Sequence, residues 1–151
     1  MGLGLNKSKE KKYELGIYGS ATYTQSVSSI NSGVTTNYWT YDIRPNMDLF
    51  LPMKFQVHAD LDYNIREKTP VFTSNNNVAL LNTWIGKKFL KNDELLIKAI
   101  GNDLLNQNIG FSRTVNSNFI SQNTYSTIKR YFMFSIVWNF NKAGTPAPNS
   151  N

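Results

Sequence analysis

Three residues that commonly bind metal ions follow one another at two-residue spacing, namely His58, Asp60 and Asp62. On one face of a β-strand, an imidazole and two carboxylates could surround a divalent cation. Side chains at positions i and i+2 of a strand are about 7 Å apart, so they converge poorly without a ligand from a neighbouring strand. We therefore expect no metal site and interpret the three residues as an ordinary polar strand face.

Asp42 and Asp60 could act as a general acid and a general base on neighbouring strands. The sequence shows no nucleophile, oxyanion hole or pocket signature beside them, and Arg44 offers a plain charge partner. No glycine-rich turn opens into a helix around Gly101–Asp103, so a phosphate loop is not expected either. The sequence thus predicts neither an enzyme nor a cofactor.

The elements that must position these residues are long β-strands. From Met53 to Arg66, apolar residues at odd positions alternate without a break with polar residues at even positions, over fourteen residues. Strands of soluble proteins usually end after about five or six residues. The segment from Tyr38 to Leu49 alternates in the same way, and only Leu51 and Pro52 need lie in the turn. Two long strands joined so tightly must be antiparallel neighbours.

Other strands are less regular, and we predict them over residues 12–28, 78–90, 94–101 and 124–141, with residues 1–5 as the end of a further strand. Short links at 51–52 and 91–93 alternate along the chain with longer polar loops at 29–37, 68–77 and 102–123. Short and long connections therefore fall on opposite edges of the sheet. Outer-membrane β-barrels have this asymmetry, with short periplasmic turns and longer extracellular loops.

The composition suits a sheet with lipid on one side. Aromatic residues make up 13% of the 151 residues and charged residues only 17%, below the quarter or so that is typical of soluble domains. A strand of about twelve residues tilted near 45° spans roughly 28 Å, close to the height of an outer-membrane apolar band. We predict an all-β fold of about six to seven antiparallel up-and-down transmembrane β-barrel strands, part of a larger barrel. They would occupy residues 1–141, followed by a disordered tail over 142–151.

Charged side chains are unfavourable in lipid, and this decides which face of the sheet meets lipid and which lines the lumen. Turning the strand Met53–Arg66 over would place several charges in lipid, at up to about 2–4 kcal/mol each. We expect the polar face to line the lumen through Asp42, Arg44, His58, Asp60, Asp62 and Arg66. We expect the apolar face to meet lipid through Trp39, Tyr41, Phe55, Leu61, Phe132, Phe134, Trp138 and Phe140. The short turn should place Arg44 opposite or diagonal to His58 and Asp60.

The C-terminal half carries motifs that resemble a known family. Lys87-Lys88-Phe89-Leu90-Lys91-Asn92 leads to Asn102-Asp103-Leu104-Leu105-Asn106, and Arg130-Tyr131-Phe132 leads to Trp138-Asn139-Phe140. This arrangement resembles the C-terminal end of a TonB-dependent receptor, especially the Bacteroidetes-type outer-membrane β-barrel family, from about Tyr38 onward. In that family the penultimate strand ends in Asp/Asn-Leu-Phe/Leu-Asn, and the last strand begins near Arg-Tyr. The chain departs from the pattern by continuing past Phe140 and by lacking anything that resembles a plug domain.

The resemblance implies TonB-driven ligand uptake through a plugged barrel in the outer membrane of a Gram-negative cell. The implied partners are outer-membrane lipid, the remainder of the barrel with its plug domain, the TonB complex through an N-terminal part, and the assembly machinery that recognises the C-terminal strand. Ligand-binding residues are not predicted from the sequence. Loop residues are candidates by topology alone, for example Asn75, Asn76, Arg113 and Asn116.

The net charge of +6 does not indicate a nucleic-acid partner, because the lysines cluster at expected tight turns, as Lys11 and Lys91 do. Residues 1–12 lack the apolar segment of a signal peptide, so we expect a mature portion or fragment whose export signal lies elsewhere. Two alternatives remain open. One is a soluble, lipocalin-like ligand-binding barrel, and the other is a small self-contained outer-membrane barrel or adhesin without transport.

Overall fold

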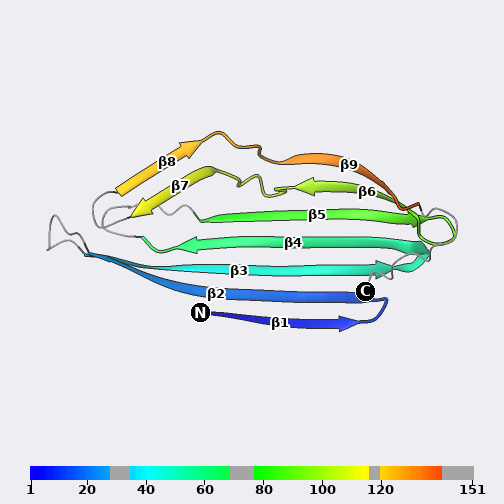
Figure 1. Ribbon diagram of the computed structural model, residues 1–151, viewed down its shortest axis with the longest axis horizontal. Coiled ribbons are helices and arrows are strands. Elements are labelled where there is room, and N and C mark those ends of the chain that lie inside the picture. Colours follow the sequence, from blue (N-terminus) through cyan, green and yellow to red (C-terminus); the bar gives the residue numbers. More distant parts are fainter. Residues whose placement is uncertain (28–34, 69–76, 116–119, 141–151) are drawn as a thin grey trace.

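One antiparallel sheet dominates the computed structural model, which describes residues 1–27, 35–68, 77–115 and 120–140 (Figure 1). Its seven strands lie in the order β1-β2-β3-β4-β5-β6-β9. Their bounds are β1 Gly2–Lys9, β2 Tyr13–Val27, β3 Thr35–Leu51, β4 Phe55–Arg66, β5 Val78–Phe89, β6 Leu95–Asn102 and β9 Tyr131–Trp138. Each strand is antiparallel to its neighbours. The predicted all-β, up-and-down architecture is confirmed for these residues.

The short turns follow a regular stagger across the sheet. The last pairs before these turns are Lys9↔Tyr13, Leu51↔Phe55 and Phe89↔Leu95. Traced through the pairing register, each turn lies two residues further along the strands than the one before it. Two residues rise about 6.8 Å along a strand, and two strands are about 9.6 Å wide. The line through the short turns is therefore inclined by roughly 35° from the perpendicular to the strands. Strands in closed barrels tilt by about this angle.

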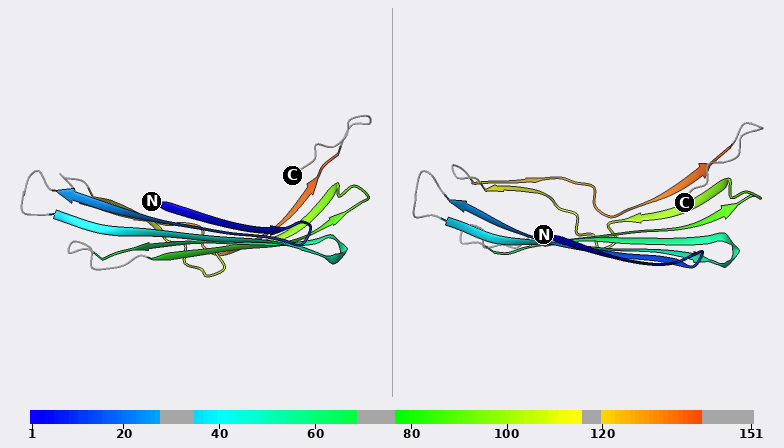
Figure 2. Two further views of the ribbon diagram at one scale, coloured as in Figure 1. Left: turned by 90° about the horizontal axis from the view of Figure 1, so that it is seen from below. Right: turned by 60° about the horizontal axis from the view of Figure 1, so that its bottom comes forward.

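The sheet has almost no interior of its own. Figure 2 shows it nearly edge-on as one curved layer, with β9 turned away from the plane of the central strands. Of the hydrophobic side chains in the described ranges, only Tyr38 is buried, at 7% exposure. Within those ranges, no helix is long and apolar enough to cross a membrane. A single layer of this kind depends on its surroundings to cover its apolar side chains.

The turn between β3 and β4 differs from the prediction. Pro52–Lys54 forms a 3₁₀ turn in which Met53 and Lys54 have φ angles of 61° and 64°. The predicted strand start at Met53 was therefore wrong. Apolar and polar residues alternate through the turn as well, so the alternation does not mark where the strand begins. The longer turn also shifts the register. Arg44 lies opposite Asp62 and diagonal to Asp60, as the flanking pairs show, and not beside His58.

The expected long loop over 102–123 contains a hairpin. Its strands, β7 Gly110–Val115 and β8 Ile120–Tyr125, form a separate two-stranded sheet. The last strand of the main sheet begins at Tyr131 and not at Thr124, which belongs to β8. The sequence Ile-Ser-Gln-Asn-Thr-Tyr of β8 gives no apolar alternation, so residue patterning predicted a loop. At the other end, β1 extends to Lys9, beyond the predicted range 1–5.

Several predictions concern residues that the structure does not describe. The proposed tail 142–151 and the loop residues Asn75, Asn76 and Asn116 lie outside the described ranges, as does the side chain of Arg113.

Candidate functional site

The pairing register sorts the side chains of the main sheet into two faces, because directly opposed residues share a face. The polar face comprises the even-numbered residues of β1 to β6 and the odd-numbered residues of β9. It includes all six predicted lumen residues, Asp42, Arg44, His58, Asp60, Asp62 and Arg66. The apolar face is the opposite one, and it includes the predicted lipid-facing residues Trp39, Tyr41, Phe55, Leu61, Phe132, Phe134 and Trp138. Phe140 follows β9, and its ring lies 6.3 Å from that of Trp138.

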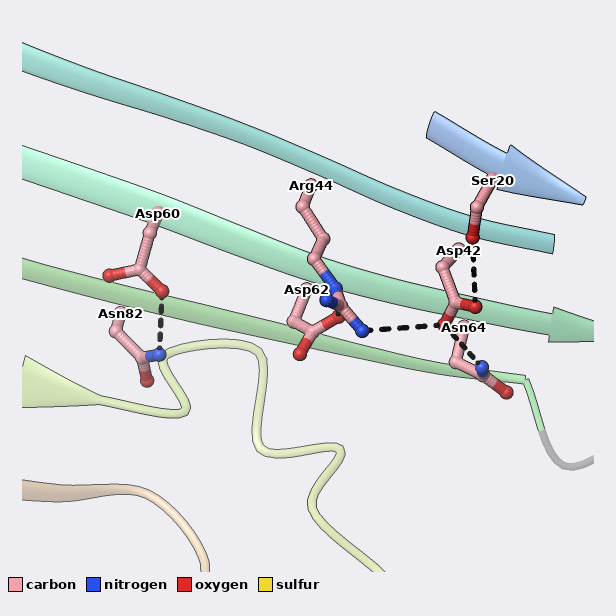
Figure 3. Close-up of polar contacts among 7 residues, drawn as sticks. All are labelled: Ser20, Asp42, Arg44, Asp60, Asp62, Asn64 and Asn82. Atoms are coloured by element: carbon pink, nitrogen blue, oxygen red, sulfur yellow. Dashed lines mark hydrogen bonds and ion pairs between the residues drawn. The ribbon is translucent and has the colours of Figure 1, made fainter. Parts of the chain in front are cut away.

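Side-chain hydrogen bonds connect neighbouring strands across the polar face (Figure 3). Ser20 Oγ donates to Asp42 Oδ2 over 3.3 Å, and Asn64 Nδ2 donates to Asp42 Oδ1 over 2.8 Å. Both partners lie directly opposite Asp42 in the register, so the side chains meet without leaving their strands. One carboxylate thereby joins β2, β3 and β4.

Arg44 pairs with the carboxylates on either side of it. Its Nε donates to Asp62 Oδ1 over 3.1 Å, and its Nη2 lies 3.8 Å from Asp42 Oδ1. The Arg44 side chain is 54% exposed, and ion pairs this open to solvent contribute at most about 1 kcal/mol. The pairs balance charge on the polar face but hold it together only weakly.

His58 belongs to a second cluster nearer the short turns. Its Nδ1 lies 2.8 Å from Asp48 Oδ1, its Nε2 lies 3.3 Å from Asp60 Oδ1, and its ring stacks on Trp84. Asn82 Nδ2 donates to the other Asp60 oxygen, Oδ2, over 2.9 Å. Both carboxylates beside His58 thus have partners within the sheet.

The predicted metal-ligand candidates turn toward different neighbours. His58 and Asp60 meet each other, whereas Asp62 turns to Arg44 on β3. In the described part of the chain, no group of three or more His, Cys, Asp or Glu side chains is placed to hold a metal ion. The two carboxylates considered as an acid and base pair, Asp42 and Asp60, lie in separate clusters.

A hollow of about 510 Å³ lies on the polar face near the long-loop end. Its lining combines two carboxylates, two guanidinium groups, amides and aliphatic side chains, from Asp42, Arg44, Asp62, Asn64, Arg66, Val78, Leu80, Asn108, Ile109 and Ser112. The Arg66 guanidinium is fixed over the Tyr38 ring, with its Cζ 4.2 Å from the ring centroid. The arrangement can take a polar ligand that also presents an apolar part.

Asp103 holds one wall of this hollow in place. Its carboxylate accepts hydrogen bonds from the backbone N–H groups of Gln107 over 2.9 Å and Asn108 over 3.0 Å, and its own N–H donates to Asn82 Oδ1 over 3.1 Å. The side chain is 4% exposed. Asn108 is also part of the lining, so the Asp103 turn positions the link after β6 over the polar face.

Sequence reasoning placed Asp103 in a motif without giving it a role. The signal that could have revealed it is the pair of residues that tolerate positive φ, Asp103 at 49° and Asn106 at 57°. The second part of the motif contacts the first, because Arg130 Nη1 donates to the Leu104 carbonyl over 3.3 Å. Asn108 Nδ2 also donates to the Ile128 carbonyl, over 3.0 Å. The two motif segments therefore form one structural unit where the hairpin β7–β8 joins the sheet.

The chain matches the model of the outer membrane protein beta-barrel family over residues 1–138. Searches of curated proteins and of solved structures gave no match. The matched range includes every strand of the sheet, so the family assignment and the two-faced architecture concern the same residues. It also leaves the soluble, lipocalin-like alternative without support. The protein belongs to the outer membrane protein beta-barrel family, and its place is the outer membrane.

Proposed function

We propose that the sheet forms part of the wall of a TonB-dependent receptor barrel and contributes to ligand uptake across the outer membrane. The observation that carries this proposal is the separation of polar and apolar side chains into two faces, which is clearest on β2, β3 and β4. Lipid against the polar face would desolvate Asp42, Arg44 and Asp60, at up to about 2–4 kcal/mol for each charge near the midplane. The polar face therefore lines the lumen in this proposal.

The apolar face needs a cover that the described residues do not supply. Phe134 is 87% exposed, and its neighbours in the same row, Phe132, Ile136 and Trp138, are each more than half exposed. A continuous row of large, exposed apolar side chains is unusual in water and ordinary in lipid. Trp39, Tyr41, Phe55, Leu61 and Phe140 extend the lipid-facing surface in the proposal.

The hollow gives the wall a place to contact a ligand. It lies beside the ends of β4 and β5 that carry the long connections, which are extracellular in barrels of this type. Arg44 and Arg66 supply hydrogen-bond donors, and Asp42 and Asp62 supply acceptors. In this proposal the role is non-enzymatic, and the hollow is an entry site where a ligand first meets the lumen wall.

The receptor assignment is supported by the unit that Asp103 and Arg130 organise. These residues belong to the two motifs that resemble the C-terminal end of TonB-dependent receptors, and the motifs contact each other. In a larger barrel, the remaining strands would pair with β1 and β9, a plug domain would fill the lumen, and the TonB complex would act on the plug. The assembly machinery would recognise β9.

The test uses the natural full-length product in its own cells. We expect an outer-membrane species whose gel mobility changes on heating, and a photo-crosslink between its periplasmic N-terminal part and TonB. An inserted, heat-modifiable product that never crosslinks to TonB would contradict the receptor role and favour a self-contained barrel. A soluble, monomeric product would contradict the barrel wall itself.

A further inference from the structure

Lysines gather along the edge of the sheet that carries the short turns. We call this the basic edge and define it by Lys7, Lys9, Lys11, Lys12, Lys54, Lys87 and Lys91. Among the described residues, only Lys54 of this set forms an ion pair, between its Nζ and Asp93 Oδ1 over 2.6 Å. The nearby Glu94 carboxylate accepts a hydrogen bond from Asn92 instead. Glu10 and Glu14 lie at the same end as Asp93 and Glu94, so the seven lysines of the basic edge face four carboxylates and the edge keeps a positive excess.

Three of these lysines project from the apolar face and not from the turns. Lys7 and Lys9 continue the row of Leu3 and Leu5 on β1. Lys87 lies on β5 with its Nζ 4.7 Å from the centroid of the Phe55 ring and 5.3 Å from that of Phe89. A lysine at the end of an otherwise apolar face can lay its hydrocarbon stem along the apolar surface and present its ammonium group at the polar boundary.

The stagger of the turns places two of these ammonium groups at one level. Lys7 lies on the same face as Lys9 and two residues before it, and Lys9↔Tyr13 is the last pair of the first hairpin. Lys87 lies in the same way two residues before Phe89, and Phe89↔Leu95 is the last pair of the third hairpin. Both lysines are therefore at the same distance from the inclined line through the short turns. The charges form a band around the wall and not a single cluster.

The opposite end of the apolar face has a different composition. Tyr23, Trp39, Tyr41 and Tyr63 occupy it, and Trp39 contacts the rings of both Tyr23 and Tyr41. In the described strands, no lysine or arginine projects from the apolar face at this end. The two ends would thus meet headgroups of different kinds, with an aromatic end and a basic end.

We propose that the basic edge binds the phosphate groups of anionic phospholipids in the periplasmic leaflet. The inference rests on the proposed barrel, in which short turns face the periplasm. Ammonium groups at a membrane surface attract anionic headgroups and donate hydrogen bonds to phosphate oxygens. Lys7, Lys9 and Lys87 are the main contacts, because they stand on the lipid-facing side of the wall.

The experiment measures lipid selectivity of the full-length product reconstituted in vesicles of phosphatidylcholine mixed equally with phosphatidylglycerol. Native mass spectrometry would count the phospholipids of each kind that stay bound. We expect the wild type to retain phosphatidylglycerol preferentially, and the triple variant K7Q/K9Q/K87Q to lose this preference, by about fivefold for each lysine removed. A matched control, K68Q/K88Q/K129Q, removes the same charge from the long-loop end and from the polar face and should keep the preference.

Equal preference in the triple variant and the wild type would overturn the inference, as would equal losses in both triple variants. The wild type offers a second readout that needs no substitution, because a preference based on ammonium groups should weaken markedly between about 0.05 and 0.5 M salt. A salt-independent preference would contradict the proposal. Failure of the wild type to insert at all would instead refute the barrel on which it rests.

Discussion

The β3–β4 hairpin and the β6–β9 end of the same sheet use polar groups in different ways. On β3 and β4, polar contacts are spread along the strands, and the side chains that make them, such as Arg44 and Asp62, are half exposed. On β6 and β9, the same face carries apolar residues such as Ile100 and Met133. There, the polar contacts concentrate in one buried carboxylate, Asp103. A spread network should tolerate the loss of any member, whereas the Asp103 turn should not.

The largest effect should come from reversing the chemistry of one face within β3–β4. Leu61→Lys places a charge on the apolar face near the middle of β4, and we expect it to destabilise the folded barrel by about 2–4 kcal/mol. Asp62→Lys, one residue away on the polar face, should cost no more than about 1 kcal/mol, because its ammonium stays in water. Urea unfolding of the protein in lipid vesicles measures both. Equal costs would contradict the assignment of the faces.

The next effect concerns the β6–β9 end. Asp103→Ala leaves the N–H groups of Gln107 and Asn108 without their charged acceptor, and we expect a loss of about 2–3 kcal/mol. Asp103→Asn keeps one acceptor oxygen and should give an intermediate loss. The same unfolding measurement applies, together with proteolysis of the link after β6. A loss no larger than that from a polar-face substitution on β4 would remove the difference between the two regions.

A smaller effect is expected within the spread network. Arg44→Leu removes the partner of Asp62, yet a double-mutant cycle with Asp62→Leu should give a coupling energy below about 1 kcal/mol, because both side chains are solvated. Asp60→Leu should behave similarly. Asp60 is outside the lining of the hollow, so Asp60→Leu should disturb the packing of the lumen wall more than the range of ligands accepted. An intact fold with an altered ligand range in Asp60→Leu would contradict this expectation.

The smallest effect should lie at the short turns. Lys54 joins the β3–β4 turn to the β5–β6 turn through Asp93 and through the Leu90 carbonyl, which its Nζ contacts over 3.0 Å. Both side chains of the ion pair are exposed, so Lys54→Gln should cost about 0.5 kcal/mol. Unfolding at low and high salt measures the cost, which should shrink as salt rises. A cost that is independent of salt would exclude an ionic contribution.

The faces of β3 and β4 could be predicted from sequence because lipid and water impose opposite requirements on alternate residues. The partners across those faces could not, because they depend on the register. The register depends on the backbone of Met53 and Lys54, which continue the apolar alternation while making a turn. The role of Asp103 was hidden for a related reason. Its partners are backbone N–H groups a few residues away, and no pattern of side-chain types records them.

The central claim is that the two faces of the sheet meet different solvents, and cysteine accessibility along β4 tests it most directly. The 151 residues contain no cysteine, so in a cysteine-free background single substitutions from Val57 to Asn64 add one reporter at a time. In the inserted protein, a water-soluble maleimide should label positions 58, 60, 62 and 64 and leave 57, 59, 61 and 63 unlabelled. A lipid-soluble quencher should show the opposite pattern. Uniform labelling, or labelling of the odd positions, would contradict the account.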